Sequence, residues 1–215
     1  MRTSGTTANV YVDGFNLYYR AVRGTPWRWL DIQSLANQLL GAKFKLHRIR
    51  YFTARIKTRG NDRRKHLRQQ VYLRALNTIS ELVIHEGHFL SNAVWMPLAS
   101  PRPGQSSLVE VIRTEEKGSD ANLAAWLTRD AAKRDCQAAF VVTGDSDFAG
   151  VIQMVRQEFS FPVHVIDPAG ASSSRLRGTA TTYNPLNRKL LPLCQFPSRL
   201  TDRSGRAITK PREWD

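Results

Sequence analysis

Four aspartates at three separate points of the chain are the residues best suited to do chemistry. They are Asp13 in VYVDGFN (10–16), Asp120 in EEKGSDANLA (115–124), and Asp145 and Asp147 in FVVTGDSDF (140–148). Four carboxylates gathered in one place repel one another unless a cation compensates them. Mg²⁺ suits such a site because it prefers oxygen ligands, keeps several waters and binds through one or two carboxylates. The pattern therefore predicts a divalent-metal site that could assist attack on a phosphate ester.

The elements that must position these acids alternate between strand and helix. Asp13 directly follows a short β-branched run at 9–12, and Asp145 follows the apolar run at 138–142. Asp120 opens a helix that has to return the chain to the start of the run at 138–142. In a mainly parallel sheet, ligands bind beyond the carboxyl ends of the strands, where the strand order reverses. We therefore expect all three sequence points to meet at one edge of one sheet.

Hydrophobic periodicity predicts the remaining elements. Strands are expected at 9–12, 47–52, 81–90, 138–142 and 162–166, and two further extended arms at 93–98 and 108–114. Helices are expected at 15–22, at 32–40 with Asp31 as the cap, from 61 or 62 to about 78, from Ser119 or Asp120 to about 133, and after 148. This order is typical of an alternating α/β fold of Rossmann-like type, with a mainly parallel central sheet.

The amino-acid composition of the chain changes after position 168. Residues 169–215 have few periodic apolar residues and carry nine Lys or Arg against three acids. We expect residues 1–168 to form the main domain, and 169–215 a basic extension that packs on it or is partly flexible.

The protein is strongly basic, with 32 Lys and Arg against 18 Asp and Glu and a net charge of +14. Between Lys43 and Arg74 there are twelve Lys or Arg and one acid, Asp62. A local excess of this kind favours contact with the phosphates of a nucleic acid over solubility alone. The residues expected to hold a phosphate backbone are Arg55, Lys57, Arg59, Arg63, Arg64, Lys65 and Arg68.

Four further polar residues lie beside the aspartates and could act with them. Lys117 could add a cationic contact to the substrate, and Asn16, Thr143 or Ser146 could orient metal-bound waters or a phosphate oxygen. Asp167 follows another predicted strand, but Asp-Pro is a common turn, so we leave it out of the metal set.

The segments VYVDGFNLYY, EEKGSDANLAAWLTRDA and VVTGDSDF together resemble the NYN domain family, in particular its LabA-like branch, which has a PIN-like nuclease fold. The likeness runs from about Asn9 to Ile166, and the tail ITKPREW is also similar to family members. The resemblance implies an α/β/α sandwich, an Mg²⁺ or Mn²⁺ site and ribonuclease activity. The positions that match the motifs are Asp13, Asn16, Asp120, Asp145 and Asp147.

The leading hypothesis is a metal-dependent endoribonuclease in which Asp13, Asp120, Asp145 and Asp147 hold the ion. A non-catalytic RNA-binding or regulatory module with the same fold is the alternative, and a metal-dependent phosphatase for small esters is a weaker one. The complete set of acids favours the enzyme over the binding module. The basic stretch favours a long polyanion over a small phosphate.

Aromatic and histidine residues allow two interpretations each. Tyr18, Tyr19, Trp27 and Trp29 could stack on unpaired bases, although closely spaced aromatics are also ordinary core material. His85 and His88 would point to opposite faces of a strand, which argues against a metal site there.

Composition also indicates the compartment. Two cysteines, Cys136 and Cys194, are too few for a disulfide framework or a zinc cluster, and Cys136 is expected to be a small buried hydrophobe. No apolar run is long enough to cross a membrane. We expect a cytoplasmic protein whose partner is RNA, and the sequence leaves a homodimer open.

Overall fold

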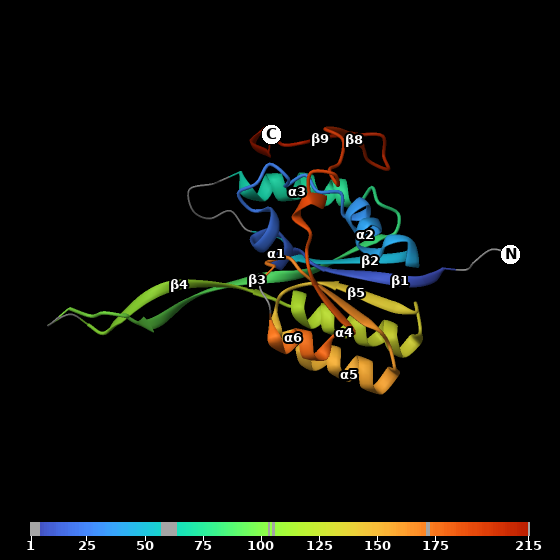
Figure 1. Cartoon of the computed structure of the whole chain (residues 1–215). Helices are drawn as coiled ribbons and strands as arrows, with labels where there is room; N and C mark the ends of the chain where they lie inside the picture. The colour runs from blue at the N-terminus through green and yellow to red at the C-terminus, as the bar shows by residue number, and fades with distance from the viewer. Residues whose placement is uncertain (1–4, 57–63, 103, 105, 171–172, 215) are drawn as a thin grey trace.

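A seven-stranded sheet forms the middle of three layers (Figure 1). The structure is a computed structural model that describes residues 5–56, 64–102, 104, 106–170 and 173–214. The strand order is β4-β3-β2-β1-β5-β6-β7, and all neighbours are parallel except β3 and β4. The strands are β1 (Thr6–Asp13), β2 (Phe44–Ala54), β3 (Leu82–Pro97), β4 (Leu108–Lys117), β5 (Ala138–Val142), β6 (Val163–Asp167) and β7 (Thr182–Pro185).

Helices cover both faces of the sheet, which confirms the three-layer α/β/α fold. One face carries α1 (Gly14–Leu17), α2 (Ile32–Leu40) and α3 (Lys65–Leu76), and the other carries α4 (Ser119–Lys133), α5 (Ala149–Phe159) and α6 (Ser174–Thr179). A π-helical turn, η1 (Tyr18–Val22), follows α1, and a short 3₁₀ turn, η3 (Ser146–Phe148), precedes α5.

The core divides into two layers because side chains alternate along buried strands. In β1, Val10 and Val12 pack on the side of the sheet that α2 and α3 cover. Tyr11 packs on the opposite side, which α4 and α5 cover. Strand β5 behaves in the same way, with Phe140 in the first layer and Val141 in the second. The apolar runs at 9–12 and 138–142 are therefore central strands, as the sequence predicts.

Helix boundaries follow the predicted caps closely. Asp31 caps α2 by accepting hydrogen bonds from the backbone N–H groups of Gln33 and Ser34 at 2.9 and 3.1 Å. Helix α3 begins at Lys65, and its predicted start at 61 or 62 lies outside the described residues.

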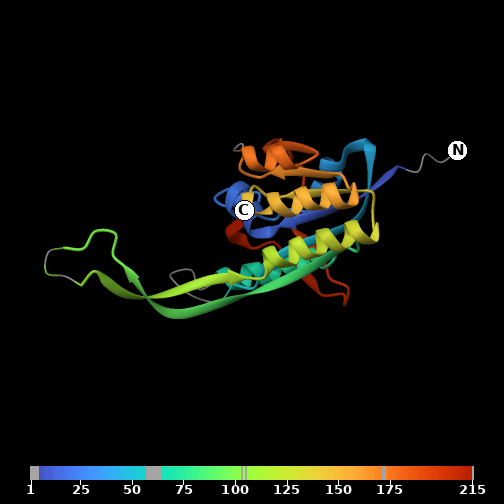
Figure 2. The same ribbon diagram turned by 90° about the horizontal axis from the view of Figure 1, so that it is seen from below.

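Strands β3 and β4 form a long arm that projects away from the body of the molecule (Figures 1 and 2). The expected strand at 81–90 and the expected arm at 93–98 are one continuous strand, because β3 leaves the parallel sheet and pairs with β4 from His88↔Lys117 to Pro97↔Leu108. Trp95 and Ile112, on one face of this arm, are 65 % and 67 % exposed, and Met96, on the other face, is 41 % exposed. Neither face of the ribbon is therefore fully covered by the rest of the described chain.

The section after position 168 takes part in the fold. Strand β7 pairs with β6, and the short hairpin of β8 (Arg199–Thr201) and β9 (Ala207–Thr209) lies on α3. Trp214 is buried against Trp29 and Tyr72, with ring centroids 6.1 and 6.0 Å apart. The central sheet thus continues past 168, and the division into a domain and an extension at that position stays a prediction.

Candidate functional site

The site lies where the strand order reverses. From β1 the chain adds β2 and β3 on one side of the sheet and later returns to add β5 on the other side of β1. The register pairs Val12 with Val142, so that Asp13 and Thr143 leave the sheet side by side. A crevice outside the carboxyl ends of the strands at such a reversal is where open α/β folds bind ligands.

Asp13 is buried and held in a fixed orientation at the end of β1. One carboxylate oxygen accepts a hydrogen bond from the backbone N–H of Asn16 at 2.9 Å, and the other accepts one from the hydroxyl of Thr143 at 3.1 Å. The next residue has to be glycine, since a Cβ at Gly14 would lie 2.7 Å from the Phe52 carbonyl oxygen and from the ring of Tyr51. The DGFN motif therefore combines a carboxylate with a backbone that packs directly on β2.

Two polar residues join the Asp13 turn to the loop after β5. The side-chain oxygen of Asn16 accepts a hydrogen bond from the N–H of Gly144 at 3.0 Å. The Thr143 hydroxyl accepts one from the N–H of Asp145 at 3.2 Å. Thr143 has no exposed surface, so it does not reach a metal-bound water or a phosphate oxygen as the sequence predicts. Its hydroxyl instead links Asp13 to the backbone of Asp145.

Asp120 arrives at the same place at the start of α4. The helix begins at Ser119, whose hydroxyl and N–H donate to the Glu116 carboxylate at 2.7 and 3.1 Å. One open cavity of about 290 Å³, here called the aspartate pocket, is lined by Asp13, Phe15, Asn16, Tyr19, Arg20, Glu116, Ser119, Asp120 and Asp145. The structure thus brings together three of the four predicted aspartates.

Two residues of the aspartate pocket, Glu116 and Arg20, are ones that we did not select from the sequence. Glu116 lies four residues before Asp120 in the quoted run EEKGSDANLA, and that spacing across a helix start was the available signal. Arg20 gave no signal, because its place depends on the π-helical turn that follows α1.

The carboxylates of the aspartate pocket repel one another. Burial is the main cause that raises the pKa of Asp13 to about 6; the Asn16 hydrogen bond opposes this rise, and the charges of Asp120 and Asp145 add to it. Burial also raises the pKa of Asp120, and the charges of Asp145 and Glu116 raise it further. Such a cluster is compensated by a cation, or by protonation when no cation is present.

The donor set fits a hydrated hard cation. In the described part of the chain, no group of three or more His, Cys, Asp or Glu side chains is arranged to hold an ion directly. The aspartate pocket is open, however, and the residues that line it include three aspartates, Glu116 and Asn16, whose side chains carry carboxylate and amide oxygens. Mg²⁺ and Mn²⁺ accept this arrangement, since Mg²⁺ in particular keeps several of its waters and needs only one or two carboxylates.

Comparison with known proteins identifies the family. Residues 7–187 match the family model of the NYN domain. The chain belongs to the NYN domain family. NYN domains are nuclease-type domains, and nucleases of this kind generally use divalent metal ions.

Two proteins similar to this NYN domain have different descriptions. The chain is 26 % identical over 234 residues to 6-hydroxy-3-succinoylpyridine 3-monooxygenase HspA of Pseudomonas putida. The aligned region covers 95 % of this chain and 74 % of that protein. A crystal structure of a protein of unknown function from Vibrio parahaemolyticus has the same fold, with a TM-score of 0.53 at 15 % identity, over 87 % of this chain and 96 % of the other.

Two of the predicted acidic and polar residues lie beside the aspartate pocket of the NYN domain. Asp147 is exposed, does not line the pocket, and donates its N–H to the Asp145 carboxylate at 3.0 Å. Ser146 opens the 3₁₀ turn and does not line the pocket either. Asp167, which we left out of the metal set, is buried and accepts hydrogen bonds from the Tyr183 hydroxyl and the Ala169 N–H.

Several of the basic residues expected to hold RNA are paired with acids. Arg55 makes two hydrogen bonds to Glu86 at 2.6 and 2.7 Å, and Lys117 forms an ion pair with Glu115 at 3.1 Å. Arg68 forms one with Glu213 at 3.3 Å. Arg64 is exposed just before α3, and Lys57, Arg59 and Arg63 lie outside the described residues.

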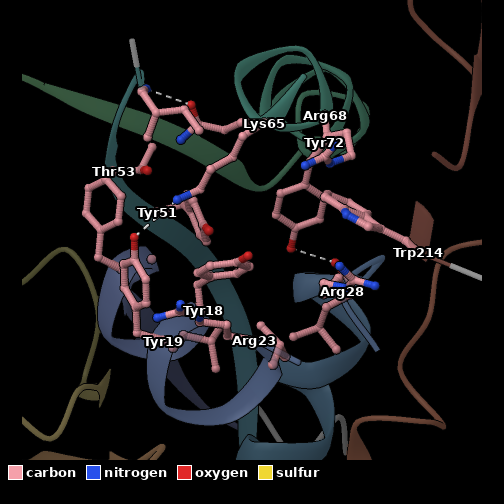
Figure 3. Close-up of a pocket in the computed structure, with 17 residues that line it drawn as sticks. Tyr18, Tyr19, Arg23, Arg28, Tyr51, Thr53, Lys65, Arg68, Tyr72 and Trp214 are labelled. Atoms are coloured by element: carbon pink, nitrogen blue, oxygen red, sulfur yellow. Dashed lines mark hydrogen bonds between the residues drawn. The ribbon is translucent and has the colours of Figure 1, made fainter. Parts of the chain in front are cut away.

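The predicted aromatic residues separate into core and surface. Trp29 has no exposed surface, so it cannot stack on a base, and Trp27 packs against the same core. Tyr18 and Tyr19 instead line a second cavity of about 360 Å³ between η1, β2 and α3 (Figure 3). We call this cavity the tyrosine pocket.

Proposed function

We propose that this NYN domain is a metal-dependent ribonuclease that hydrolyses RNA phosphodiester bonds. The observation that carries the proposal is the convergence of Asp13, Asp120 and Asp145 on one open pocket at the reversal of strand order. Membership of a nuclease-type family supports it. The net charge of +14 favours a long polyanion as substrate.

Six residues in or beneath the aspartate pocket have a role in this proposal. Asp13, Asp145 and Asp120 would hold Mg²⁺ or Mn²⁺ through their carboxylates and through water. An ion held there would supply Lewis-acid polarisation of a phosphoryl oxygen and would lower the pKa of a water molecule. Thr143 and Asn16 fix the carboxylates in position, and Arg20 provides a positive charge at the rim of the pocket for the substrate phosphate.

The charges of the aspartate pocket explain why the substrate needs a cation. A phosphodiester brings a negative charge toward carboxylates that already raise each other's pKa. Without compensation this approach is unfavourable, and a binding protein would gain nothing from the acids. A catalytic role is therefore the better explanation of their arrangement than RNA binding alone.

The deciding experiment is cleavage of single-stranded and structured RNA by the purified protein in Mg²⁺, Mn²⁺ or EDTA. Asp145→Asn should lose at least about 100-fold in rate. Glu110→Gln, an equally mild change at an exposed residue of β4, should retain full activity. Equal cleavage by wild type and Asp145→Asn, or full activity in EDTA, would contradict the proposal.

A second candidate function is oxygenation of an aromatic heterocycle. The one observation that favours it is the similarity to the pyridine monooxygenase of Pseudomonas putida along 95 % of this chain. Oxygen consumption with a hydroxypyridine carboxylic acid and reduced nicotinamide cofactor would test it. Uptake of oxygen that depends on the pyridine, together with no RNA cleavage, would favour this function over the ribonuclease.

A further inference from the structure

The tyrosine pocket has the size and the walls of a small-ligand site. Its volume of about 360 Å³ lies within the usual range for ligand cavities, roughly 300–1,000 Å³. Aromatic rings from four separate parts of the chain surround it: Tyr18 and Tyr19 from η1, Tyr51 from β2, Tyr72 from α3, and Trp214 from the C-terminal turn (Figure 3). Walls of this kind favour a flat ring that can stack on them.

The tyrosine pocket is also positively charged. Arg23, Arg28, Lys65 and Arg68 line it, and none of the described residues that line it is acidic. Arg23 and Lys65 both lie over the ring of Tyr19, at 5.4 and 5.8 Å from its centroid. No ion pair between either of them and an acid is found among the described residues. These two cations therefore carry charge that an anionic ligand could compensate.

Arg28 adds an unused hydrogen-bond donor. Its terminal nitrogen donates to the Glu213 carbonyl oxygen at 2.6 Å, while its buried Nε has no hydrogen-bond partner in the described structure. A buried polar atom without a partner is uncommon in folded proteins. A bound anionic or carbonyl oxygen is one group that would satisfy it.

The tyrosine hydroxyls do not cancel this charge. Burial raises the pKa of both Tyr51 and Tyr72, so their phenols stay neutral. The Tyr72 hydroxyl donates to the Leu30 carbonyl oxygen at 2.8 Å, which fixes that ring in the wall of the pocket.

The tyrosine pocket adjoins the aspartate pocket. Phe15 and Tyr19 line both cavities, and their rings are stacked with centroids 6.4 Å apart. The two cavities therefore share a wall made by this pair of rings.

We propose that the tyrosine pocket binds one planar aromatic ring that carries an anionic group, such as a nucleotide with its phosphate. The ring stacks among Tyr18, Tyr19 and Tyr51, and the anion contacts Arg23 and Lys65. Two sources share this chemistry: a nucleotide unit of RNA whose neighbouring phosphate reaches the aspartates, and a free aromatic carboxylic acid. The nucleotide source rests on the proposed ribonuclease function, whereas the binding itself does not.

Titration of the full chain with uridine monophosphate, adenosine monophosphate, the unphosphorylated nucleosides and 6-hydroxynicotinate, followed by intrinsic fluorescence, tests the proposal. Nucleotides should bind at least about tenfold more tightly than the nucleosides. Binding of 6-hydroxynicotinate alone would support the pocket chemistry and assign the free acid as the source. Failure of all the anionic aromatics to bind would overturn the proposal.

Variants place the binding in the tyrosine pocket. Lys65→Ala removes an exposed cation without touching the core and should weaken nucleotide binding about fivefold or more. Tyr18→Ala should weaken it about tenfold, and Tyr18→Phe should restore it. Arg199→Ala, at an exposed cation of β8, is the matched control and should change nothing. Binding that neither Lys65→Ala nor Tyr18→Ala weakens would overturn the assignment.

Asp145→Asn separates this proposal from the ribonuclease. It should slow RNA cleavage by at least about 100-fold. It should leave mononucleotide binding unchanged, because Asp145 does not line the tyrosine pocket. Normal nucleotide binding with no RNA cleavage by wild type would contradict the ribonuclease alone. Cleavage of RNA by a protein that binds no mononucleotide would contradict the tyrosine pocket alone.

Discussion

Asp13 shows at the scale of one residue how function and stability oppose each other. Its carboxyl group is buried, accepts two hydrogen bonds and has a pKa raised to about 6. Because the pKa is higher in the folded than in the unfolded state, the folded protein holds this proton more tightly. The contribution of Asp13 to stability is therefore favourable at low pH and is lost as the pH rises from about 4 to about 6.

Asp13→Asn should accordingly stabilise the metal-free protein at pH 7.5. The amide removes the buried charge and keeps an oxygen for the Asn16 N–H, so the Tm should rise by about 3 °C or more. Addition of Mg²⁺ should raise the Tm of wild type and leave that of the variant unchanged. A lower Tm for the variant in EDTA would show that the ionised carboxylate stabilises the fold.

A buried ion pair elsewhere has a structural role. Arg50 makes two hydrogen bonds to Asp130 at 2.6 and 2.9 Å, Tyr11 donates to the same carboxylate at 2.8 Å, and the guanidinium lies 3.9 Å from the Trp126 ring centroid. Asp130→Ala should lower the free energy of unfolding by about 3–5 kcal/mol, because it leaves Arg50 buried without its partner.

The double variant Arg50→Met Asp130→Ala is the control for this prediction. It removes both charges and should recover most of the lost free energy of unfolding in urea denaturation. An equally large loss in the double variant would mean that packing, and not the unpaired charge, accounts for the effect.

At the scale of elements, two tryptophans distinguish the body from the arm. Trp29 has no exposed surface and packs against Tyr72, Phe196 and Trp214, whereas Trp95 on β3 is 65 % exposed. Trp29→Ala should lower the free energy of unfolding by about 3–5 kcal/mol. Trp95→Ala should change it by less than about 0.5 kcal/mol. A large loss from Trp95→Ala would indicate that the arm is buried in solution, for example in a homodimer.

Individual elements were predictable to different extents. The central strands were predictable because continuous apolar runs have few alternatives, and α2 because Asp31 supplies a cap before an apolar stripe. The arm of β3 and β4 was not predictable. The residues at 81–98 do not show that β3 continues past the edge of the parallel sheet and pairs there with β4. Strand β7 was missed because its four residues carry no periodic apolar pattern.

At the scale of the whole molecule, ion pairs reduce the number of basic residues that are available to contact RNA. Of the basic stretch between Lys43 and Arg74, Arg50, Arg55, Arg68 and Arg74 pair with acids that lie far away in sequence. Lys65, by contrast, faces the tyrosine pocket beside the aspartates. The path of RNA is therefore expected along this edge of the sheet.

Salt should weaken RNA binding strongly if this path is right. Affinity for a single-stranded RNA should fall at least about tenfold between 50 and 200 mM salt. Each phosphate contact contributes about −0.7 to the slope of the logarithm of the binding constant against the logarithm of the salt concentration. Lys65→Ala should reduce the slope, and Arg199→Ala should leave it unchanged. Affinity that does not vary with salt would mean that the basic residues do not contact phosphates.

The molecule has no described helix that is long and apolar enough to cross a membrane. Membership of the NYN domain family, the three-layer fold and the meeting of Asp13, Asp120 and Asp145 all agree with what the sequence indicates. The roles of these residues in catalysis and metal binding stay predictions.

The sequence alone determined the alternation of strand and helix, and therefore the edge at which the aspartates meet, because strand direction fixes where each loop emerges. Tertiary structure alone decided the membership of the aspartate pocket. It placed Asp147 outside, brought Glu116 and Arg20 in, and put Thr143 beneath the carboxylates. It also created the tyrosine pocket, whose walls come from residues as far apart as Tyr18 and Trp214. Such contacts depend on how helices pack across the sheet, and local sequence patterns carry no information about that packing.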